Sequence, residues 1–213
     1  MSPTTVVITG ASGGIGRALA AQLTQSGMGV VAVGRDADRL RDVPAVARVV
    51  ADVTTPEGAS AVLAGAQAAL GGPPGGLAHC VGSTLIAPLH RTRAEAYREL
   101  MRVNLDSAVF MLQAWLNALA GAPGAAVLVS SVVARTGVAS HEAIAAAKGG
   151  VEALVRSAAA TYAPQGVRVN AVAPGLTETP MTAKMLSLPA QREAAAKQYP
   201  LWVVCSRPTR WRR

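Results

Sequence analysis

Apolar residues along this 213-residue chain fall into two alternating patterns. Short runs rich in Val and Ile indicate buried strands, and longer stretches with apolar residues three and four positions apart indicate helices. The predicted strands lie at about 4–9, 29–33, 46–51, 77–81, 125–130 and 167–172. The predicted helices lie at about 15–26, 57–70, 93–100, 105–120, 142–162 and 182–197. Strands that alternate with helices predict an α/β fold, a doubly wound parallel β-sheet with helices on both faces.

The alternation continues through residues 1–200, which predicts a single domain. A chain of this length can bury a full core without further crosslinks. The segment 71–76, Gly-Gly-Pro-Pro-Gly-Gly, is predicted to be a loop and not a domain boundary, because the alternation continues across it. Residues 201–213 break the pattern and are predicted to form an aberrant basic tail.

A glycine-rich turn joins the first predicted strand to the first predicted helix. The β-branched run Thr5–Thr9 is followed at once by Gly-Ala-Ser-Gly-Gly-Ile-Gly, residues 10–16. Glycines let the backbone approach a phosphate closely, and the free N–H groups and dipole at a helix start favour negative charge. The turn predicts a dinucleotide pyrophosphate site, although a tight turn alone would also use glycines. The candidate cofactor-binding residues in it are Gly10, Ser12, Gly14, Ile15 and Gly16.

The three glycines at positions 10, 14 and 16 fit the pattern T-G-x-x-x-G-x-G, in which the chain resembles the short-chain dehydrogenase/reductase family. Further motifs follow in the family's order along about residues 4–200. They are Asp52-Val53, His79-Cys80-Val81-Gly82 where the family usually has Asn-Asn-Ala-Gly, Val103-Asn104-Leu105, Ser131, Lys148, the segment 170–175, and Thr179. Together these motifs are specific. The resemblance implies a Rossmann-like fold and an oxidoreductase of small carbonyls or alcohols.

The resemblance also implies roles for individual residues. In the family, a Tyr protonates the carbonyl oxygen as hydride arrives, and a Lys lowers the pKa of that Tyr and holds the ribose. A Ser hydrogen-bonds the substrate oxygen, and an Asn supports a water relay. The corresponding catalytic residues here are Ser131, Lys148 and Asn104. The implied cofactor contacts beyond the glycine turn are Asp52, Val53, Gly82, Lys148, Pro174, Gly175 and Thr179.

Ile144 stands at the position of the family's catalytic Tyr, four residues before Lys148. Its side chain has no proton to give, and a positioned general acid contributes about 10²–10⁴ in rate. His141, one turn earlier, is a candidate catalytic residue because imidazole titrates near neutral pH. Lys148 acting through a water is a second candidate. The alternative for His141 is a side chain that only satisfies the backbone or faces water.

Two functions follow from this mixture of retained and lost residues. The first is an oxidoreductase with impaired or rerouted proton transfer, which the retained Ser131, Asn104 and Lys148 favour. The second is a catalytically inactive dinucleotide-binding protein, a sensor or a relic, which Ile144 favours.

The end of the second predicted strand bears on the choice of cofactor. An acidic residue there would accept hydrogen bonds from the adenosine ribose and repel a 2′-phosphate. This chain has Gly34 and Arg35 instead. A guanidinium binds phosphate through charge-assisted hydrogen bonds, so NADP is favoured over NAD. The alternative is that Arg35 is an ordinary solvated residue near Asp36 and Asp38.

The composition argues against several other classes of protein. With only two cysteines, Cys80 and Cys205, we expect a reduced, cytoplasmic setting rather than a disulfide framework. No apolar stretch of about 18 residues lacks polar breaks, and no signal-peptide pattern precedes the first strand, so we expect no membrane partner. His79 and His90 lack ligand spacing, so no metal site is expected. The net charge of +8 is half local to the tail, with no basic face beside it, so no nucleic-acid partner is expected.

The tail departs from the family's pattern at Trp202. Family members usually continue through a further helix and a last strand, so we expect the last strand to be missing. A shifted reading frame in a GC-rich gene would explain the abrupt change. In the family, the helices carrying the Asn and the Lys usually pair across a two-fold interface, and the last strand commonly builds the second interface of a tetramer. We therefore expect a homodimer, or an unstable monomer, and not a tetramer.

Overall fold

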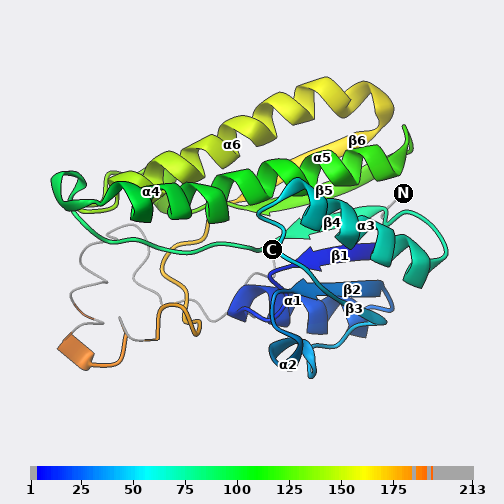
Figure 1. The fold of residues 1–213 in the computed structure, drawn as a ribbon, viewed down its shortest axis with the longest axis horizontal. Helices are drawn as coiled ribbons and strands as arrows, with labels where there is room; N and C mark the ends of the chain where they lie inside the picture. Colours follow the sequence, from blue (N-terminus) through cyan, green and yellow to red (C-terminus); the bar gives the residue numbers. More distant parts are fainter. Residues whose placement is uncertain (1–3, 184–185, 191–192, 194–213) are drawn as a thin grey trace.

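Six parallel strands form one sheet in the computed structural model, which describes residues 4–183, 186–190 and 193 (Figure 1). The strands are β1 Thr5–Thr9, β2 Gly29–Gly34, β3 Ala47–Val50, β4 Gly76–His79, β5 Gly124–Val129 and β6 Val167–Val172. The helices are α1 Gly14–Gln25, α2 Ala37–Leu40, α3 Pro56–Leu70, α4 Ala94–Met101, α5 Ser107–Leu119 and α6 Glu142–Tyr162. The strand order is β3-β2-β1-β4-β5-β6. The predicted fold class is confirmed.

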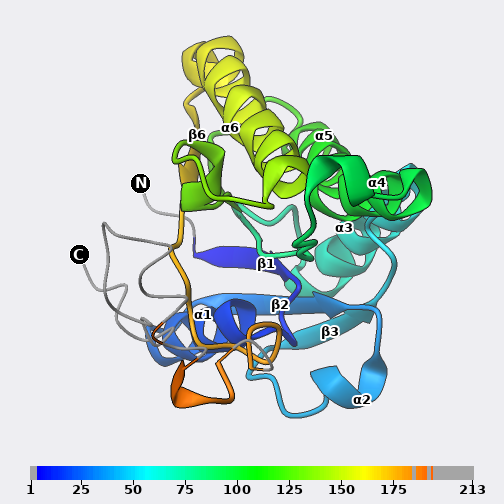
Figure 2. The same ribbon diagram turned by 90° about the vertical axis from the view of Figure 1, so that its left-hand side faces the viewer.

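Both faces of the central strands β1, β2 and β4 are buried, which explains why these strands are almost continuously apolar. Successive residues of a strand point to opposite faces. On one face, Val7 and Val31 pack in a core with α3, α5 and α6 that includes the fully buried Trp115. On the other face, Ile8 packs with residues of α1 and α2 such as Leu40. Figure 2 shows α5 and α6 over one face and α1 over the other.

The carboxyl ends of the strands meet at one edge of the sheet, and this edge positions the site. The parallel register places Thr9 of β1 beside Val33 of β2 and beside His79 of β4. The chain builds β1, β2 and β3 outward in one direction and then returns to the other side of β1 to form β4. In open α/β sheets, ligands bind in the crevice at this reversal of strand order.

A π-helical turn, Arg102–Asp106, joins α4 to α5 without a break. The apolar pattern predicts two separate helices at 93–100 and 105–120, so it misses this turn. Asn104 lies at its centre and is buried. Single π turns inside α-helices are often found at functional sites.

Two other local differences separate the structure from the sequence prediction. The short helix α2 is not predicted; Asp36 caps it by accepting a hydrogen bond from the backbone N–H of Arg39 at 3.1 Å. A helix is predicted over 182–197, but residues 181–183 form a turn, in which the Thr182 hydroxyl donates to the carbonyl oxygen of Thr177 at 2.6 Å. Residues 189, 190 and 193 are helical.

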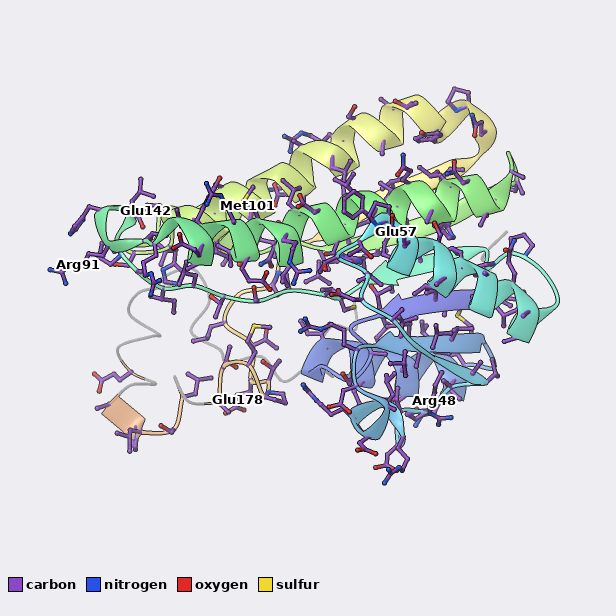
Figure 3. The ribbon with its side chains drawn as sticks, in the orientation of Figure 1. Arg48, Glu57, Arg91, Met101, Glu142 and Glu178 are labelled. Carbon is purple, nitrogen blue, oxygen red and sulfur yellow. The ribbon has the colours of Figure 1, made fainter. Side chains whose placement is uncertain are left out.

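The predicted tail, residues 201–213 with Cys205, lies outside the described residues, and so does the expected loss of a last strand. Charged side chains such as Arg48, Arg91 and Glu142 project from the outside of the molecule (Figure 3). Within the described part of the chain, none of the helices has the length and apolar character needed to cross a membrane.

Candidate active site

Three glycines shape the turn between β1 and α1. Gly10 has a φ of +69°, and a Cβ there would approach the carbonyl carbon of Cys80 to 2.8 Å. A Cβ on Gly16 would lie 2.3 Å from the carbonyl oxygen of Gly10, and one on Gly14 would lie 2.7 Å from Cγ2 of Thr179. The α1 helix begins without a side-chain cap, so its first N–H groups are open to an anion. This cradle fits a pyrophosphate.

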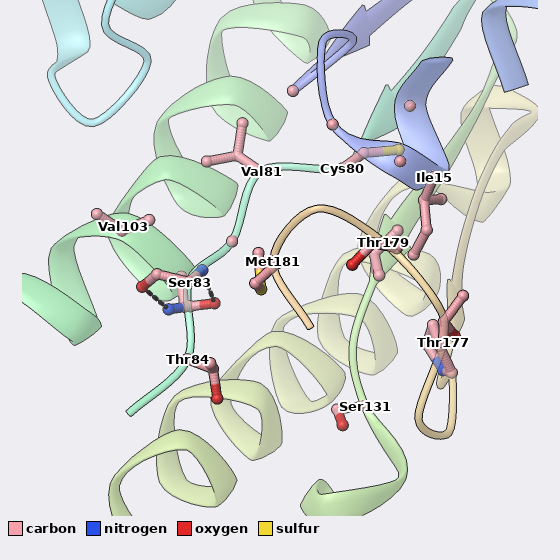
Figure 4. A pocket seen from close by; sticks show the side chains of 18 of the residues that line it. Ile15, Cys80, Val81, Ser83, Thr84, Val103, Ser131, Thr177, Thr179 and Met181 are labelled. Atoms are coloured by element: carbon pink, nitrogen blue, oxygen red, sulfur yellow. Dashed lines mark hydrogen bonds between the residues drawn. The ribbon is translucent and has the colours of Figure 1, made fainter. Parts of the chain in front are cut away.

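A cavity of about 890 Å³ runs from this turn across the carboxyl ends of the strands. Every residue predicted to bind cofactor or to act in catalysis lines it: Gly10, Ser12, Gly14, Ile15, Gly16, Arg35, Asp52, Val53, Gly82, Asn104, Ser131, His141, Lys148, Pro174, Gly175 and Thr179. Figure 4 shows Ile15, Thr179 and Ser131 converging from three segments of the chain. The structure thus brings these residues together, while their individual roles stay predictions.

Lys148, on α6, is buried at the centre of the cavity wall. Its Nζ donates to the carbonyl oxygen of Val129 at 2.8 Å. Burial lowers the pKa of this amine to about 8. A Cβ on Gly82 would lie 3.4 Å from Nζ and 3.1 Å from Oδ1 of Asn104, so this glycine lets the loop after β4 approach both side chains.

Asn104 ties the π turn to the loop after β4. Its Nδ2 donates to the carbonyl oxygen of Leu100 and to Oγ of Ser83, both at 3.0 Å. Its Oδ1 accepts a hydrogen bond from the backbone N–H of Ser83 at 3.2 Å (Figure 4). Because both ends of the amide are engaged, the side chain is held in one orientation at the cavity wall.

Ser131 follows β5 and faces the cavity. Its Oγ accepts a hydrogen bond from the backbone N–H of Val133 at 3.4 Å. The neighbouring Ser130 is buried and donates to Oε1 of Glu152 at 3.1 Å, and Arg135 donates to Oε2 of the same carboxylate at 2.7 Å. Sequence reasoning missed this buried glutamate, which fixes the chain on both sides of Ser131.

Ile144 lines the cavity and packs in a small apolar cluster. Only 4% of its surface is exposed, and the buried members of its cluster are Leu100, Val133 and Ala143. The partly buried neighbours Leu85, Val132 and Val138 complete the surroundings. The position four residues before Lys148 is therefore filled by an alkyl group in apolar surroundings.

His141 lines the cavity at the start of α6 and is 4% exposed. Its Nδ1 lies 2.7 Å from the carbonyl oxygen of Ala139. A carbonyl oxygen only accepts, so Nδ1 carries the hydrogen of this bond, and in neutral imidazole Nε2 is then a proton acceptor. Ser140, between these residues, has a φ of +62°, a left-handed conformation that is uncommon for serine. This bond to the backbone agrees with the structural interpretation of His141.

His79, at the end of β4, contacts β1 and α5. Its Nδ1 lies 2.8 Å from Oγ1 of Thr9, and its Nε2 lies 3.0 Å from Oγ of Ser107. Burial, with a smaller contribution from the charge of Lys148, lowers the pKa of His79 to about 3, so the ring is neutral. No cluster of three or more potential metal-binding side chains occurs in the part of the chain that the structure describes.

Arg35 leaves the end of β2 with an exposed side chain at the cavity rim. Arg39 of α2 lines the same end of the cavity, and Arg17 donates to the carbonyl oxygen of Arg39 at 2.9 Å. Sequence reasoning missed Arg39 because α2 has no apolar periodicity of its own. Cys80 also lines the cavity, and burial raises the pKa of its thiol to about 12, so it stays protonated.

Asp52 follows β3 and lines the cavity near these basic residues. Its Oδ1 accepts hydrogen bonds from the backbone N–H and the hydroxyl of Thr54, at 3.1 and 2.7 Å. Its Oδ2 lies 3.5 Å from Nη1 of Arg102, a residue that the motifs do not indicate.

Comparison with known proteins identifies the family to which this geometry belongs. Residues 10–207 match a family model described as enoyl-(acyl carrier protein) reductase. The cis-4-hydroxycyclohexanecarboxylate dehydrogenase of Sinomonas cyclohexanicum is 37% identical over 203 residues, which cover 90% of this chain and 80% of the relative. The chain belongs to the short-chain dehydrogenase/reductase family.

Two further short-chain dehydrogenases/reductases extend the comparison. A solved structure of an oxidoreductase of this family from Burkholderia thailandensis is 31% identical, with a TM-score of 0.84, and the match covers 98% of this chain and 82% of that one. A relative named inactive 2-(S)-hydroxypropyl-CoM dehydrogenase 2, from Xanthobacter autotrophicus, is 37% identical over 156 residues, or 71% of this chain and 67% of the relative. Short-chain dehydrogenases/reductases bind NAD(P), which the glycine cradle fits.

Proposed function

We propose that this protein is an NADP(H)-dependent oxidoreductase that acts on a small alcohol or carbonyl compound with impaired or rerouted proton transfer. The observation that carries the proposal is the cavity that joins the glycine turn to Ser131, Asn104 and Lys148. A dinucleotide on the turn and a substrate at Ser131 would share this space. Hydride transfer requires such an arrangement, because the reacting atoms must approach to about 3–3.5 Å.

The residues that would hold the cofactor come from several loops at the sheet edge. The N–H groups of the glycine turn would bind the pyrophosphate, and Arg35 would bind the 2′-phosphate. Asp52 would accept a hydrogen bond from adenine, and Lys148 would contact the ribose next to the nicotinamide. When bound, NADP(H) supplies or accepts the hydride.

The substrate would lie at the opposite end of the cavity. The Ser131 Oγ accepts from a backbone N–H, which leaves its hydroxyl hydrogen to donate to the substrate oxygen. Ile86, Leu176 and Met181 line the cavity and offer an apolar surface. These features favour a small alcohol or carbonyl compound with an apolar body.

The proton is the part of the reaction for which the site lacks its usual donor. Ile144 has none, so a proton would reach the substrate oxygen from Lys148 through a water or from a cationic His141. The pKa of about 8 leaves most Lys148 amines protonated at neutral pH, so this residue has a proton to give. Neutral His141 would act in the opposite direction, as an acceptor of the alcohol proton during oxidation.

A second candidate function is dinucleotide binding without turnover. The burial of Ile144 among alkyl side chains favours it, because no titratable group replaces the lost acid inside that cluster. The relative from Xanthobacter that is named inactive shows that the family name alone does not guarantee activity.

Cofactor titration followed by a substrate panel distinguishes these functions. NADPH and NADH are titrated by the change in their fluorescence. The protein is then assayed with NADP+ or NAD+ and cis-4-hydroxycyclohexanecarboxylate or other alicyclic and aliphatic alcohols, and with NADPH or NADH and the matching ketones. Turnover supports the oxidoreductase. Tight binding with no turnover across the panel supports the second candidate, and no binding of either dinucleotide contradicts both.

We also propose that the protein forms a homodimer through α5 and α6. Both helices lie on the same face of the sheet, and α5 leaves Val109 37% exposed beside the partly buried Phe110. An apolar strip on an outer helix is more stable when a second subunit covers it. Light scattering should give a mass near twice 21.6 kDa. A stable monomer or tetramer would contradict the proposal.

A further inference from the structure

Arg102, the first residue of the π turn, links two elements at the dinucleotide end of the cavity. Its Nε and Nη2 donate to the two carboxylate oxygens of Glu99 at 2.7 and 2.9 Å, a paired contact that fixes the guanidinium plane. Its Nη1 donates to Oδ2 of Asp52 at 3.5 Å and also to Oγ1 of Thr54. The guanidinium therefore connects α4 to the loop that follows β3.

The Asp52 carboxylate is almost fully occupied by these contacts. A carboxylate offers about four acceptor positions. Oδ1 accepts twice from Thr54, and Oδ2 accepts from Arg102. One position on Oδ2 remains, on a residue that lines the cavity. A carboxylate held in this way is prepared to accept one further N–H donor from a ligand.

The backbone of Asp52 is fixed from its other side by α3. A Cβ on Gly58 would lie 1.9 Å from the carbonyl oxygen of Asp52, so the first turn of α3 packs directly on this loop. Thr55 caps α3 by accepting a hydrogen bond from the N–H of Gly58 at 3.1 Å. With the backbone held by α3, the side-chain direction of Asp52 depends on Thr54 and Arg102.

We propose that Arg102 is a positioning residue for the adenine half of the cofactor. It holds the Asp52 carboxylate ready to accept a hydrogen bond from the exocyclic amine of adenine. It also connects that carboxylate to the π turn that carries Asn104, at the other end of the cavity. The proposal rests on the proposed binding of NADP(H).

The charges around Asp52 agree with this role. Burial would raise the pKa of Asp52, but hydrogen bonds from Thr54 and from Arg102 outweigh it and hold the pKa below its ordinary value. Glu99 repels this carboxylate, and Arg35 lies near enough to Glu99 to offset part of its charge. An ionised carboxylate accepts a hydrogen bond from the adenine amine more strongly than a neutral carboxyl group does, so the adenine contact is strong above the pKa of Asp52 and weakens as the pH falls through it. Loss of Arg102 raises that pKa and moves the weakening to higher pH.

The test compares NADPH with its hypoxanthine analogue, in which a carbonyl oxygen replaces the exocyclic amine. The wild-type protein should bind NADPH about tenfold more tightly, because a hydrogen bond to a charged group is lost with the analogue. Arg102→Met should lose most of this preference, and its NADPH affinity should decline at higher pH than in the wild type. Reduced nicotinamide mononucleotide, which has no adenine, should bind equally to both proteins.

Two further variants keep the test decisive. Arg102→Lys retains a cation and should recover part of the preference. Glu99→Gln removes the exposed carboxylate that fixes the Arg102 guanidinium plane. It should cause an intermediate loss of the preference for NADPH, and it can be measured even where Arg102→Met does not fold. An unchanged preference in these variants overturns the proposal, and so does an equal loss of affinity for the mononucleotide. Failure of the wild type to bind NADPH overturns the proposed function, and this inference with it, before any substitution is made.

Discussion

The cavity has a dinucleotide end at the glycine turn and a proposed proton-transfer end at Ile144. The proposed function of the first end depends on backbone geometry, and that of the second depends on side-chain chemistry. At the first end, backbone geometry decides: Gly10, Gly14 and Gly16 leave no room for a Cβ. At the second end, the proposed proton transfer depends on the side chain present, and the buried Ile144 offers only an alkyl group. The cradle therefore depends on several glycines, whereas the proposed proton transfer depends on single side chains. The two ends should respond separately to substitution.

The largest effect is expected from placing a phenol four residues before Lys148. Ile144→Tyr would place a hydroxyl on the same helix face as Lys148, four residues away. The cation would lower the pKa of the new phenol, and reductase activity should rise by up to about 10²–10⁴ if proton transfer limits the wild type. Steady-state rates with NADPH and a reactive ketone measure the change.

Ile144→Phe is the matched control, because it adds the same ring without the hydroxyl. It should leave the rate near the wild-type value. His141→Ala completes the set: if His141 supplies the proton, its removal should abolish wild-type activity and spare the Ile144→Tyr variant. If all these variants bind NADPH and none changes the rate, rerouted proton transfer is wrong.

A single added methyl group at the glycine turn should weaken dinucleotide binding. Gly16→Ala would place a Cβ 2.3 Å from the carbonyl oxygen of Gly10, which forces the turn apart. NADPH affinity should fall by about 10- to 100-fold, the equivalent of the usual cost of overpacking a tight site. Gly149→Ala is the control, since apart from its chain neighbours and the nearby backbone of its own helix no atom lies within 4 Å of the added Cβ. It should leave binding unchanged and raise the free energy of unfolding by about 1 kcal/mol.

A smaller effect at the same end concerns the choice between cofactors. Arg35→Asp should weaken NADPH binding by about tenfold and spare or improve NADH binding, because the carboxylate repels the 2′-phosphate and accepts from the ribose. Parallel titrations of the two dinucleotides measure the ratio. Equal changes in both affinities would contradict the proposed preference for NADP(H).

The last effect is on stability, not on rate or affinity, and comes from Lys148, which lies between the two ends. Its pKa is lowered from 10.5 to about 8, so the unfolded chain binds more protons between these values and the wild type gains stability as the pH rises through them. Relative to Lys148→Met, the wild-type free energy of unfolding should increase by up to about 3 kcal/mol across this range. Chemical denaturation at several pH values measures it. If the difference in the free energy of unfolding does not change with pH, burial does not lower the pKa of the Lys148 amine.

Much of the fold can be predicted from the sequence because its signals are local. The run Thr5–Thr9 is predicted as a strand from β-branched residues alone and is β1 in the structure. The alternation of strands and helices then leaves few arrangements other than a parallel sheet. The short α2 depends on one cap, Asp36, and on no apolar stripe, so an apolar pattern cannot reveal it.

The sequence predicts which segments form the site, but it does not predict the hydrogen bonds between their side chains. Motifs that follow parallel strands must gather at one edge, and for that reason Gly10, Asp52 and Ser131 line one cavity. The contacts between side chains are different, because His79 and Thr9 are 70 residues apart and no local pattern pairs them. The links from Arg102 to Asp52 and from Ser130 to Glu152 are equally nonlocal.

The π turn at Arg102–Asp106 sets the phase between two helices. In a regular α-helix each residue advances the chain by about 100° around the axis, so one extra residue rotates everything after it by that angle. Arg102 and Asn104 both lie on this turn and contact different loops. Deletion of one residue here would return the chain to regular helix and turn one of the two contacts away. This segment should therefore tolerate changes of side chain better than a change in its length.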